Sequence, residues 1–334
     1  MADVKAEKKE KEARKKRHER RVALLLQSSA EKYWYPNQEE SQEGGWNAGD
    51  YFAARVWNTD KITPIPPMYL TDDPSSGRPR GCLQIVSIKI ASIRGGLRWP
   101  IDVFGMVTAR DVLDLDRKRN IIFARARSNC QTITEKDPYL LLTGPTRAVV
   151  TCMDPGTIEI VLKVKGATES DDRDLSFLVL TLKSGGYCSF DGDYNSKRST
   201  LKLQFHHIYQ AVEATISVQL TCGSSLPPGG FQGVFTASTA NIHNAEILLL
   251  AFKDARLPVA DDGTIILSRR VVSVGYGRSD RLKVSILARS DEETGEIDTG
   301  DALVFIPQKH GTSCGVLNVG VCKMQVTVAW SLLP

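Results

Sequence analysis

The sequence lacks the residue clusters that most catalytic and metal-binding sites require. Its five histidines are scattered, with no H-E-x-x-H pair and no Cys/His pairing at zinc spacing. There is no Walker motif and no G-x-G-x-x-G between a strand and a helix, which removes the common phosphate-cradling loops. No apolar run approaches the roughly 18 residues that a membrane-spanning helix needs. We therefore expect no enzyme activity, no cofactor, no bound metal and no membrane span.

Disulfide spacing is also missing. The seven cysteines stand singly and include no C-x-x-C pair; they occupy positions 82, 130, 152, 188, 222, 314 and 322. An odd, dispersed set is typical of reduced thiols inside a cell. The first apolar cluster, Val22 to Leu26, is too short for a secretory signal, and no Asn-x-Ser/Thr acceptor occurs. These features predict a cytoplasmic or nuclear protein that is not secreted.

Positive charge is concentrated at the N-terminus. Residues 1–21 hold ten Lys or Arg against five Asp or Glu, an excess of +5, so the remainder of this +4 chain carries −1. The composition of the remainder gives no reason to expect nucleic-acid binding. Any contact with nucleic acid is therefore expected only through the N-terminal tail.

The tail, residues 1–32, predicts a basic, charged helix. It has no Gly or Pro and carries i,i+4 pairs such as Glu7–Lys11 and Glu10–Arg14. Its first five turns lack an apolar stripe, so we expect a solvated, partly disordered helix. Its basic cluster is a candidate import signal or partner patch, with a solubilising charged face as the alternative; the candidate residues are Arg14, Lys15, Lys16, Arg17, Arg20 and Arg21.

Residues 33–80 predict an extended arm rich in aromatic residues and proline. Three of the five tryptophans, Trp34, Trp46 and Trp57, lie here, although disordered linkers are poor in aromatics. The stretch from Pro64 to Pro67 favours polyproline-like backbone. We expect the aromatics to dock on the protein's own domain, with docking on a partner as the alternative. The three tryptophans are the candidate partner-docking residues.

Residues 81–334 predict a single all-β domain. Apolar and polar residues alternate from Cys322 to Leu332, which gives a strand one apolar and one polar face. Similar runs follow Ile158, Ala214 and Leu282, and turn signals such as Asp154-Pro155-Gly156 separate them. No helical period long enough for βαβ units occurs. The fold class that this pattern favours is a large antiparallel β-sandwich of Greek-key type.

One motif resembles a catalytic one. Gly311 to Gly315 satisfies the G-x-S-x-G pattern of the hydrolase nucleophile elbow, with Ser313 in the central position. The elbow requires a helix after the serine and an acid and a histidine further along the chain. A strand follows instead, and no Asp, Glu or His comes after Ser313. We interpret the segment as a glycine-rich loop and predict no catalytic residue.

Acidic and histidine pairs admit weaker interpretations. Acidic clusters could coordinate calcium at one end of a sandwich if their oxygens converged; they comprise Asp111, Asp114, Asp116, Asp171, Asp172, Asp174, Asp261 and Asp262. His206 and His207 adjoin in a strand and face opposite ways, which favours structural roles. Arg110, Asp111, Asp114 and Arg117 predict a surface ion-pair network. Glycosidase-type carboxylate pairs stay open, because their geometry is three-dimensional.

An ordered series of strings resembles a known family. The strings are Leu83–Lys89, Arg94–Gly105, Arg110-Asp111, Arg119–Phe123, Asn129–Thr132, Leu142–Val150, Leu162–Gly166 and Gly320–Leu332. Over residues 80–334 they are similar to the plant domain-of-unknown-function family numbered 6598, which is abundant in grasses. The resemblance implies no established activity and occasional fusion to ribosome-inactivating domains. It carries over no functional residue.

The function that these observations favour is a non-catalytic interaction module. A protein partner, or another macromolecule, would bind through loops, the aromatic arm or the basic tail. One alternative is an RNA- or ribosome-associated enzyme or accessory, which only the resemblance suggests. Another is a carbohydrate-binding β-sandwich that uses exposed aromatics. The oligomeric state stays open.

Overall fold

The described part of the chain is built almost entirely of β-strands. The computed structural model describes residues 62–63, 77–114, 118–151, 156–182, 188–221, 232–240, 246–252, 257–289, 298–320 and 322–334. Every pairing between the strands of this part is antiparallel. The all-β prediction is confirmed. No helix among these residues has the length and apolar character to span a membrane.

The strands fall into two halves on either side of one long strand. The first half holds β1 (Arg80–Ile93), β2 (Ile101–Arg110), β3 (Asn120–Arg125), β4 (Gln131–Ile133), β5 (Val149–Val150), β6 (Gly156–Val164), β7 (Arg173–Leu182) and β8 (Cys188–Asn195), with short 3-10 helices η1 (Arg127–Asn129) and η2 (Glu169–Asp171). Then comes β9 (Ser199–Leu220). The second half holds β10 (Gln232–Thr239), β11 (Ile247–Phe252), β12 (Val271–Gly275), β13 (Leu282–Arg289), β14 (Asp298–Phe305), β15 (His310–Val319) and β16 (Cys322–Ser331).

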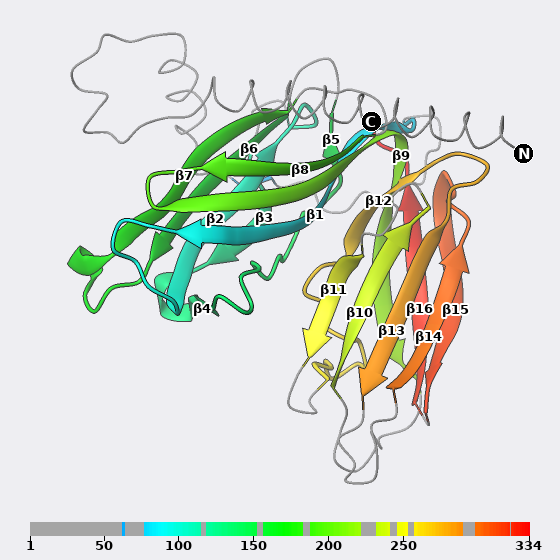
Figure 1. Cartoon of the computed structure of the whole chain (residues 1–334). Helices are drawn as coiled ribbons and strands as arrows, with labels where there is room; N and C mark the ends of the chain where they lie inside the picture. Colours follow the sequence, from blue (N-terminus) through cyan, green and yellow to red (C-terminus); the bar gives the residue numbers. More distant parts are fainter. Residues whose placement is uncertain are drawn as a thin grey trace, which may run out of the picture.

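Strand β9 belongs to both halves. Its first part, from Ser199 to Ile208, pairs with β1 and β8. Its second part, from Ala211 to Leu220, pairs with β12 and β16. Figure 1 shows β9 bending where it passes from one half to the other. Leu201, Leu203 and Phe205 lie in the core of the first half, and the run from Val212 to Val218 contributes its even-numbered residues to the core of the second, so one strand contributes to two separate cores.

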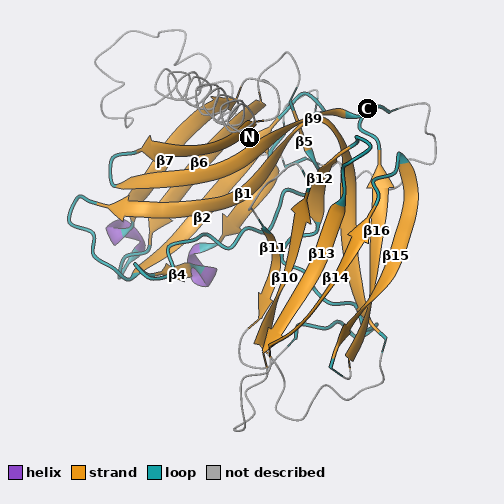
Figure 2. Cartoon of the chain, turned by 45° about the vertical axis from the view of Figure 1, so that its right-hand side comes forward, coloured by secondary structure: helices purple, strands orange, loops and turns teal. Residues whose placement is uncertain are grey.

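Each half is a sandwich of two sheets, as Figure 2 shows. The seven-stranded sheet, with the order β15-β16-β9-β1-β5 and with β8 and β12 also paired to β9, supplies one layer to both halves. The sheet β3-β2-β6-β7, extended by β4, covers it in the first half. The sheet β11-β10-β13-β14 covers it in the second. The sequence did not predict this division of the block into two sandwiches.

The buried apolar residues follow the same division. One cluster runs from Leu83 to Phe205 and fills the first half. A second runs from Val212 to Leu332 and fills the second half. A small third cluster lies at the junction, and its members are Cys82, Val86, Ala148, Val150, Ile208, Ala211 and Leu333. The fold therefore has two main cores joined by a small one.

Buried charge holds the junction together. The guanidinium of Arg147 is fully buried and binds both oxygens of Asp111, at 2.7 and 2.8 Å, and Asp114 at 2.9 Å. Asp111 also accepts the backbone N–H of Val150, at 2.8 Å. Although burial acts to lower it, the hydrogen bonds and charges of the two aspartates raise the pKa of Arg147. This cation is thus held charged inside the junction.

Two side chains of strand β9 contact the segment that follows Arg147. The carboxylate of Glu213, fully buried on β9, accepts the N–H of Ala148 at 2.7 Å. His207, also on β9, lies 2.7 Å from the hydroxyl of Thr151. The segment from Arg147 to Thr151 therefore connects the Asp111 turn to the middle of β9.

A second buried arginine joins β1 to the second half. The register of β1 against β9 shifts between Ile85 and Ser87, which leaves Val86 as a bulge residue. Arg269 is 1% exposed and donates to the carbonyls of Ile85 and Val86. The backbone N–H of Arg269 donates to the carbonyl of Leu249 on β11, at 3.0 Å. Burial lowers the pKa of Arg269 to about 9, so it is still protonated at neutral pH.

The free edges of the sheets are covered. In the first half, Ser199 Oγ donates to the Leu175 carbonyl on β7 at 2.8 Å, and Ser196 accepts the N–H of Phe177. On β3, the Ile122 carbonyl accepts the N–H groups of Thr143 and Gly144. This approach needs glycine, because a Cβ at position 144 would lie 1.8 Å from the Ile121 carbonyl oxygen. Such covering blocks strand addition by other chains.

In the second half, β14 and β15 meet along the edge of the sandwich. Asp301 on β14 accepts the N–H of Asn318 on β15 at 2.7 Å. This backbone hydrogen bond lowers the pKa of Asp301. The contact closes the sandwich at its outer edge.

Two expectations from the sequence are wrong in detail. The ion pairs of Arg110, Asp111 and Asp114 are buried rather than on the surface: Arg110 binds Glu159 at 2.5 Å, and the aspartates bind Arg147. Arg117 lies outside the described residues. The segment Gly311–Gly315 is part of strand β15, not a loop.

We predict that Arg147→Met destabilises the protein by about 3–5 kcal/mol, because it leaves two buried carboxylates without their cation. Urea unfolding monitored by circular dichroism measures this. Arg127→Met is the matched control, since Arg127 and Asp172 form a partly exposed pair at 2.9 Å whose loss should cost much less than that of Arg147. Equal losses for the two variants would contradict the role given to Arg147.

We also predict that Asp301→Asn flattens the loss of stability in acid. A carboxylate whose pKa is lowered by folding stabilises the protein above its unfolded pKa, and this contribution disappears as pH falls through the folded pKa. The free energy of unfolding, measured from about pH 6 down to pH 2.5, should fall less in the variant than in the wild type. Parallel curves would show that the Asp301–Asn318 contact contributes nothing.

Candidate functional site

The reactive side chains within the described ranges are used for structure. No group of three or more His, Cys, Asp or Glu in this part of the chain is placed to hold a metal ion. Asp111 and Asp114 are occupied by Arg147, as described above. The hydroxyl of Ser313 accepts a hydrogen bond from the indole N–H of Trp330, at 2.9 Å. Its strand is paired along its length with β16, and no histidine or acid stands beside it in that pairing.

A different feature stands out on the second half: the solvent-facing side of the sheet β11-β10-β13-β14. We call it the outer face, and its residues alternate with core residues along the four strands. They are Gln232, Val234, Thr236, Ser238, Leu248, Ala251, Lys283, Ser285, Leu287, Gly300, Ala302 and Val304. Most are apolar, hydroxyl-bearing or glycine. Solvent-facing sides of antiparallel sheets are normally polar.

The strand register places these residues in rows across the sheet. One row is Leu248, Thr236, Ser285 and Ala302, and the next is Ala251, Val234, Leu287 and Gly300. Neither row contains a charge. Leu287 in the second row is 49% exposed; Val304, at 62%, lies in a further row beside Lys283. Together the rows form a continuous uncharged surface on the second half.

The centre of the outer face holds a pair of hydroxyls. The hydroxyls of Thr236 and Ser285 lie 2.9 Å apart and bond to each other across β10 and β13. One hydroxyl donates and the other accepts, so the pair itself satisfies one of its two O–H donors. Lys283 is the one charged residue among the outer-face side chains named above. A partner that covers the centre therefore has one hydroxyl donor to satisfy and no charge to desolvate.

The opposite side of the same sandwich differs. There β15, β16 and β9 present Val316 beside Gln325 and Gln219, in a single cross-strand row. Lys323 is exposed on the same strand as Gln325. Val316 is 45% exposed, close to Leu287, but its cross-strand neighbours are amides. Isolated exposed apolar residues of this kind are ordinary, whereas contiguous ones mark interaction sites.

The site residues expected from the sequence lie elsewhere. The basic cluster from Arg14 to Arg21 and the three tryptophans Trp34, Trp46 and Trp57 are outside the described residues. At the described end of the arm, Thr63 donates its N–H to the Arg119 carbonyl at 2.9 Å. Thr63 is 9% exposed there. This contact joins residues 62–63 to the domain, and docking of the arm's aromatics stays a prediction.

The outer face was missed because it needs the strand register. Leu287 stands on the polar side of the Leu282–Ala288 alternation, and Val304 interrupts the polar positions of β14, with Ile306 following just after the strand. These interruptions were the only signal in the sequence. The pairing of the four strands shows that these residues lie on one face of the sheet.

The comparisons with known proteins address the whole domain. The family model described as "Domain of unknown function (DUF6598)" matches residues 82–328. The chain belongs to this family. The match confirms the family that the sequence strings resemble, and the DUF6598 domain includes both halves and the junction. Its plant origin stays a prediction.

Matches to individual proteins are remote. No curated protein sequence matches the chain. Among solved structures, human GIVD cytosolic phospholipase A2 has 8% identity and a TM-score of 0.22, covering 77% of this chain and 33% of that one. The C2A and C2B domains of Extended-Synaptotagmin 2 have 11% identity and a TM-score of 0.23, with 83% and 100% coverage. This chain thus spans about a third of the phospholipase chain, and TM-scores this low do not establish a shared fold.

We predict that Ser313→Ala lowers stability by about 1 kcal/mol, because the buried Trp330 N–H loses its acceptor. Thermal unfolding followed by tryptophan fluorescence checks this. A fluorophosphonate probe, which labels activated serines, should label neither the wild type nor the variant. Labelling of the wild type that disappears in Ser313→Ala would contradict the structural role.

Proposed function

We propose that this DUF6598 protein is a non-catalytic interaction module that binds a protein partner through its outer face. The observation that carries the proposal is the pair of adjacent uncharged rows on that face, which include Leu287 at 49% exposure. Depletion of charge at the centre is the compositional mark of protein interfaces. The basic tail and aromatic arm are proposed as further contacts with the partner.

The physical gain comes from apolar area. When a partner covers an exposed aliphatic side chain, burial stabilises the complex by about 25 cal/mol for each Å² of apolar surface removed from water. Among the large apolar side chains of the outer face, Val304 and Leu287 are the most exposed, and Leu248, on the edge strand β11, is 37% exposed. The Thr236–Ser285 pair beside them offers one O–H donor to the partner. The face therefore supports binding by packing rather than by charge.

The rigidity of the face favours the same role. Its strands β10 and β13 are paired over eight consecutive residues, from Gln232 to Thr239. Its inner side packs on the second core, where Phe235, Ala237 and Val284 are fully buried. A preorganised surface loses little conformational entropy on binding.

The proposal includes an intracellular location, in the cytoplasm or nucleus. It is supported by Cys130 and Cys314, whose thiols form no disulfide in the part of the chain that the structure describes. Cys82 and Cys322 are buried in separate clusters. A partner from the same compartment is expected.

The test replaces Leu287 by lysine, which places a charge at the centre of the face. Wild-type and Leu287→Lys proteins serve as baits in native tissue extract, and captured proteins are quantified by mass spectrometry. A direct partner should be depleted about 30-fold or more with the variant, corresponding to about 2 kcal/mol for a central contact. Val316→Lys is the matched control, because it adds the same charge at a similarly exposed aliphatic position on the opposite side.

The proposal predicts a set of proteins lost with Leu287→Lys and retained with Val316→Lys. Both variants should keep the wild-type melting temperature within a few degrees, since both sites are exposed. If no captured protein distinguishes the two variants, the outer face is not the binding site. A third bait lacking residues 1–32 separates partners held by the tail from those held by the face.

A further inference from the structure

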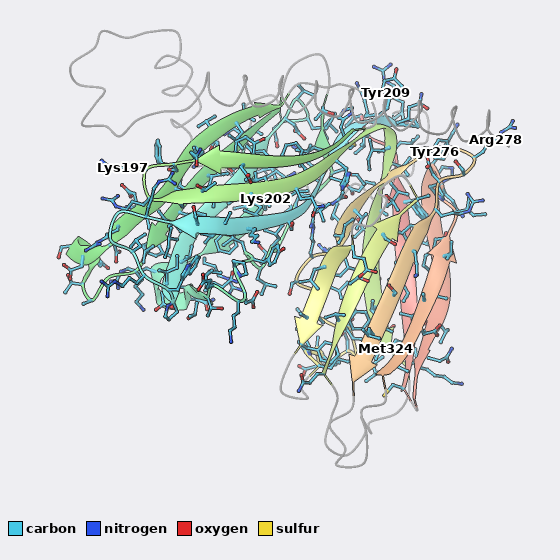
Figure 3. All side chains as sticks on the ribbon, in the orientation of Figure 1. Lys197, Lys202, Tyr209, Tyr276, Arg278 and Met324 are labelled. Atoms are coloured by element: carbon cyan, nitrogen blue, oxygen red, sulfur yellow. The ribbon has the colours of Figure 1, made fainter. Side chains whose placement is uncertain are left out.

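One end of the second half gathers basic and exposed apolar residues. The turn between β12 and β13 contributes Arg278 and Arg281, and the connection from β14 to β15 contributes Ile306 and Lys309. Arg78 joins them by pairing with Leu333, directly after β16. We call this the basic end. Figure 3 labels Tyr209, Tyr276 and Arg278 there, near the C-terminus marked in Figure 1.

Backbone pairing fixes these positions relative to one another. Leu282 on β13 pairs with Phe305 on β14, so Arg281 and Ile306 are neighbours at the strand ends. The N–H of Tyr276 donates to the Gln210 carbonyl at 2.8 Å, which brings the β12 turn beside Tyr209 on β9. The residues therefore share one surface although they are far apart in the sequence.

The charge of this end has one sign. Arg78, Arg278 and Lys309 are exposed, and Arg281 is half-buried. In the segments 77–80, 276–281, 306–310 and 331–334, Asp280 is the sole acidic side chain. It is 3% exposed and accepts the N–H of Gly277 at 2.7 Å, inside its own turn. The exposed side chains thus form a cationic surface.

Apolar side chains project from the same surface. Ile306 is 62% exposed and Tyr209 is 59% exposed, among the highest values for large apolar residues in the described chain. Val304, two residues before Ile306, is equally exposed. Exposed cations in the neighbouring turns, Arg278 and Lys309, share this end with the exposed amides Gln210 and Gln308.

We propose that the basic end docks on an anionic lipid surface. Arginine and lysine are attracted to acidic headgroups, while a protruding isoleucine and a tyrosine enter the boundary between headgroups and acyl chains. Aliphatic side chains gain nothing from a phosphodiester backbone, whereas nucleic-acid surfaces use aromatic platforms for bases. The mixture of Ile306 with arginines therefore fits lipid better than RNA. This site is separate from the outer-face centre and goes beyond the proposed function.

The test uses the full chain with vesicles of phosphatidylcholine alone or with 30% phosphatidylserine, read by cosedimentation. Binding is expected only with phosphatidylserine, and raising salt from 0.1 to 0.5 M should weaken it. The double variant Arg278→Glu with Lys309→Glu should lose tenfold or more in partition coefficient. Ile306→Ser should lose a smaller factor that persists at high salt.

Matched controls separate this end from general charge. Lys136→Glu with Lys197→Glu makes the same charge change at exposed sites in the first half and should bind like the wild type. Both pairs are also made in a chain whose tail residues Arg14, Lys15, Lys16 and Arg17 are glutamine, so that any tail contribution is removed. The loss caused by the basic-end variant should persist in that background.

Three outcomes would overturn the proposal. The first is equal vesicle binding by the basic-end variant and its control, and the second is a loss of binding caused only by the tail substitutions. The third is a failure to bind vesicles together with binding of poly(U) RNA that Arg278→Glu with Lys309→Glu abolishes, which would assign the surface to nucleic acid. Melting temperatures of all variants, expected near the wild type, show that each chain is folded.

Discussion

The two halves of the protein depend on one buried cation. Arg147 binds Asp111 and Asp114, and its neighbours Ala148 and Val150 donate their backbone N–H groups to Glu213 and Asp111. These contacts join the turn after β2, the short strand β5 and the middle of β9 at a single place. Because the carboxylates are buried, they are tolerated only while the guanidinium is present. Arg269 makes a second connection between the halves, because its guanidinium donates to the carbonyls of Ile85 and Val86 at the bulge in β1.

This junction determines what the rest of the molecule can present. With β9 fixed in both cores, the second half is held as a closed sandwich whose outer face has two adjacent rows without charge. The basic end lies at the strand ends of the same sandwich, and Val304 on β14 and Ile306 just after it link the two surfaces. Among the residues that the structure describes, neither surface has a group of three or more His, Cys, Asp or Glu placed to hold a metal ion. Their chemistry is that of contact and charge.

The sequence predicted what depends on local alternation and missed what depends on long-range pairing. The six apolar residues from Cys322 to Leu332 are all buried, as the alternation requires. The division into two sandwiches was not predicted, because the break in alternation between Phe205 and Val212 does not say which strands pair with each part of β9. The Arg147–Asp111 contact joins residues 36 positions apart, so the acidic cluster was interpreted as surface. The exposure of Leu287 likewise depends on which strands flank β13.

Native-state hydrogen exchange tests the central claim, that the junction makes the two halves one cooperative unit. Exchange is measured by mass spectrometry at increasing urea below the unfolding midpoint, on peptides from β6 in the first half and β13 in the second. The account predicts that the slowest amides of both peptides open with the same free energy and the same dependence on urea. Opening of one half at distinctly lower free energy, while the other stays protected, would contradict it.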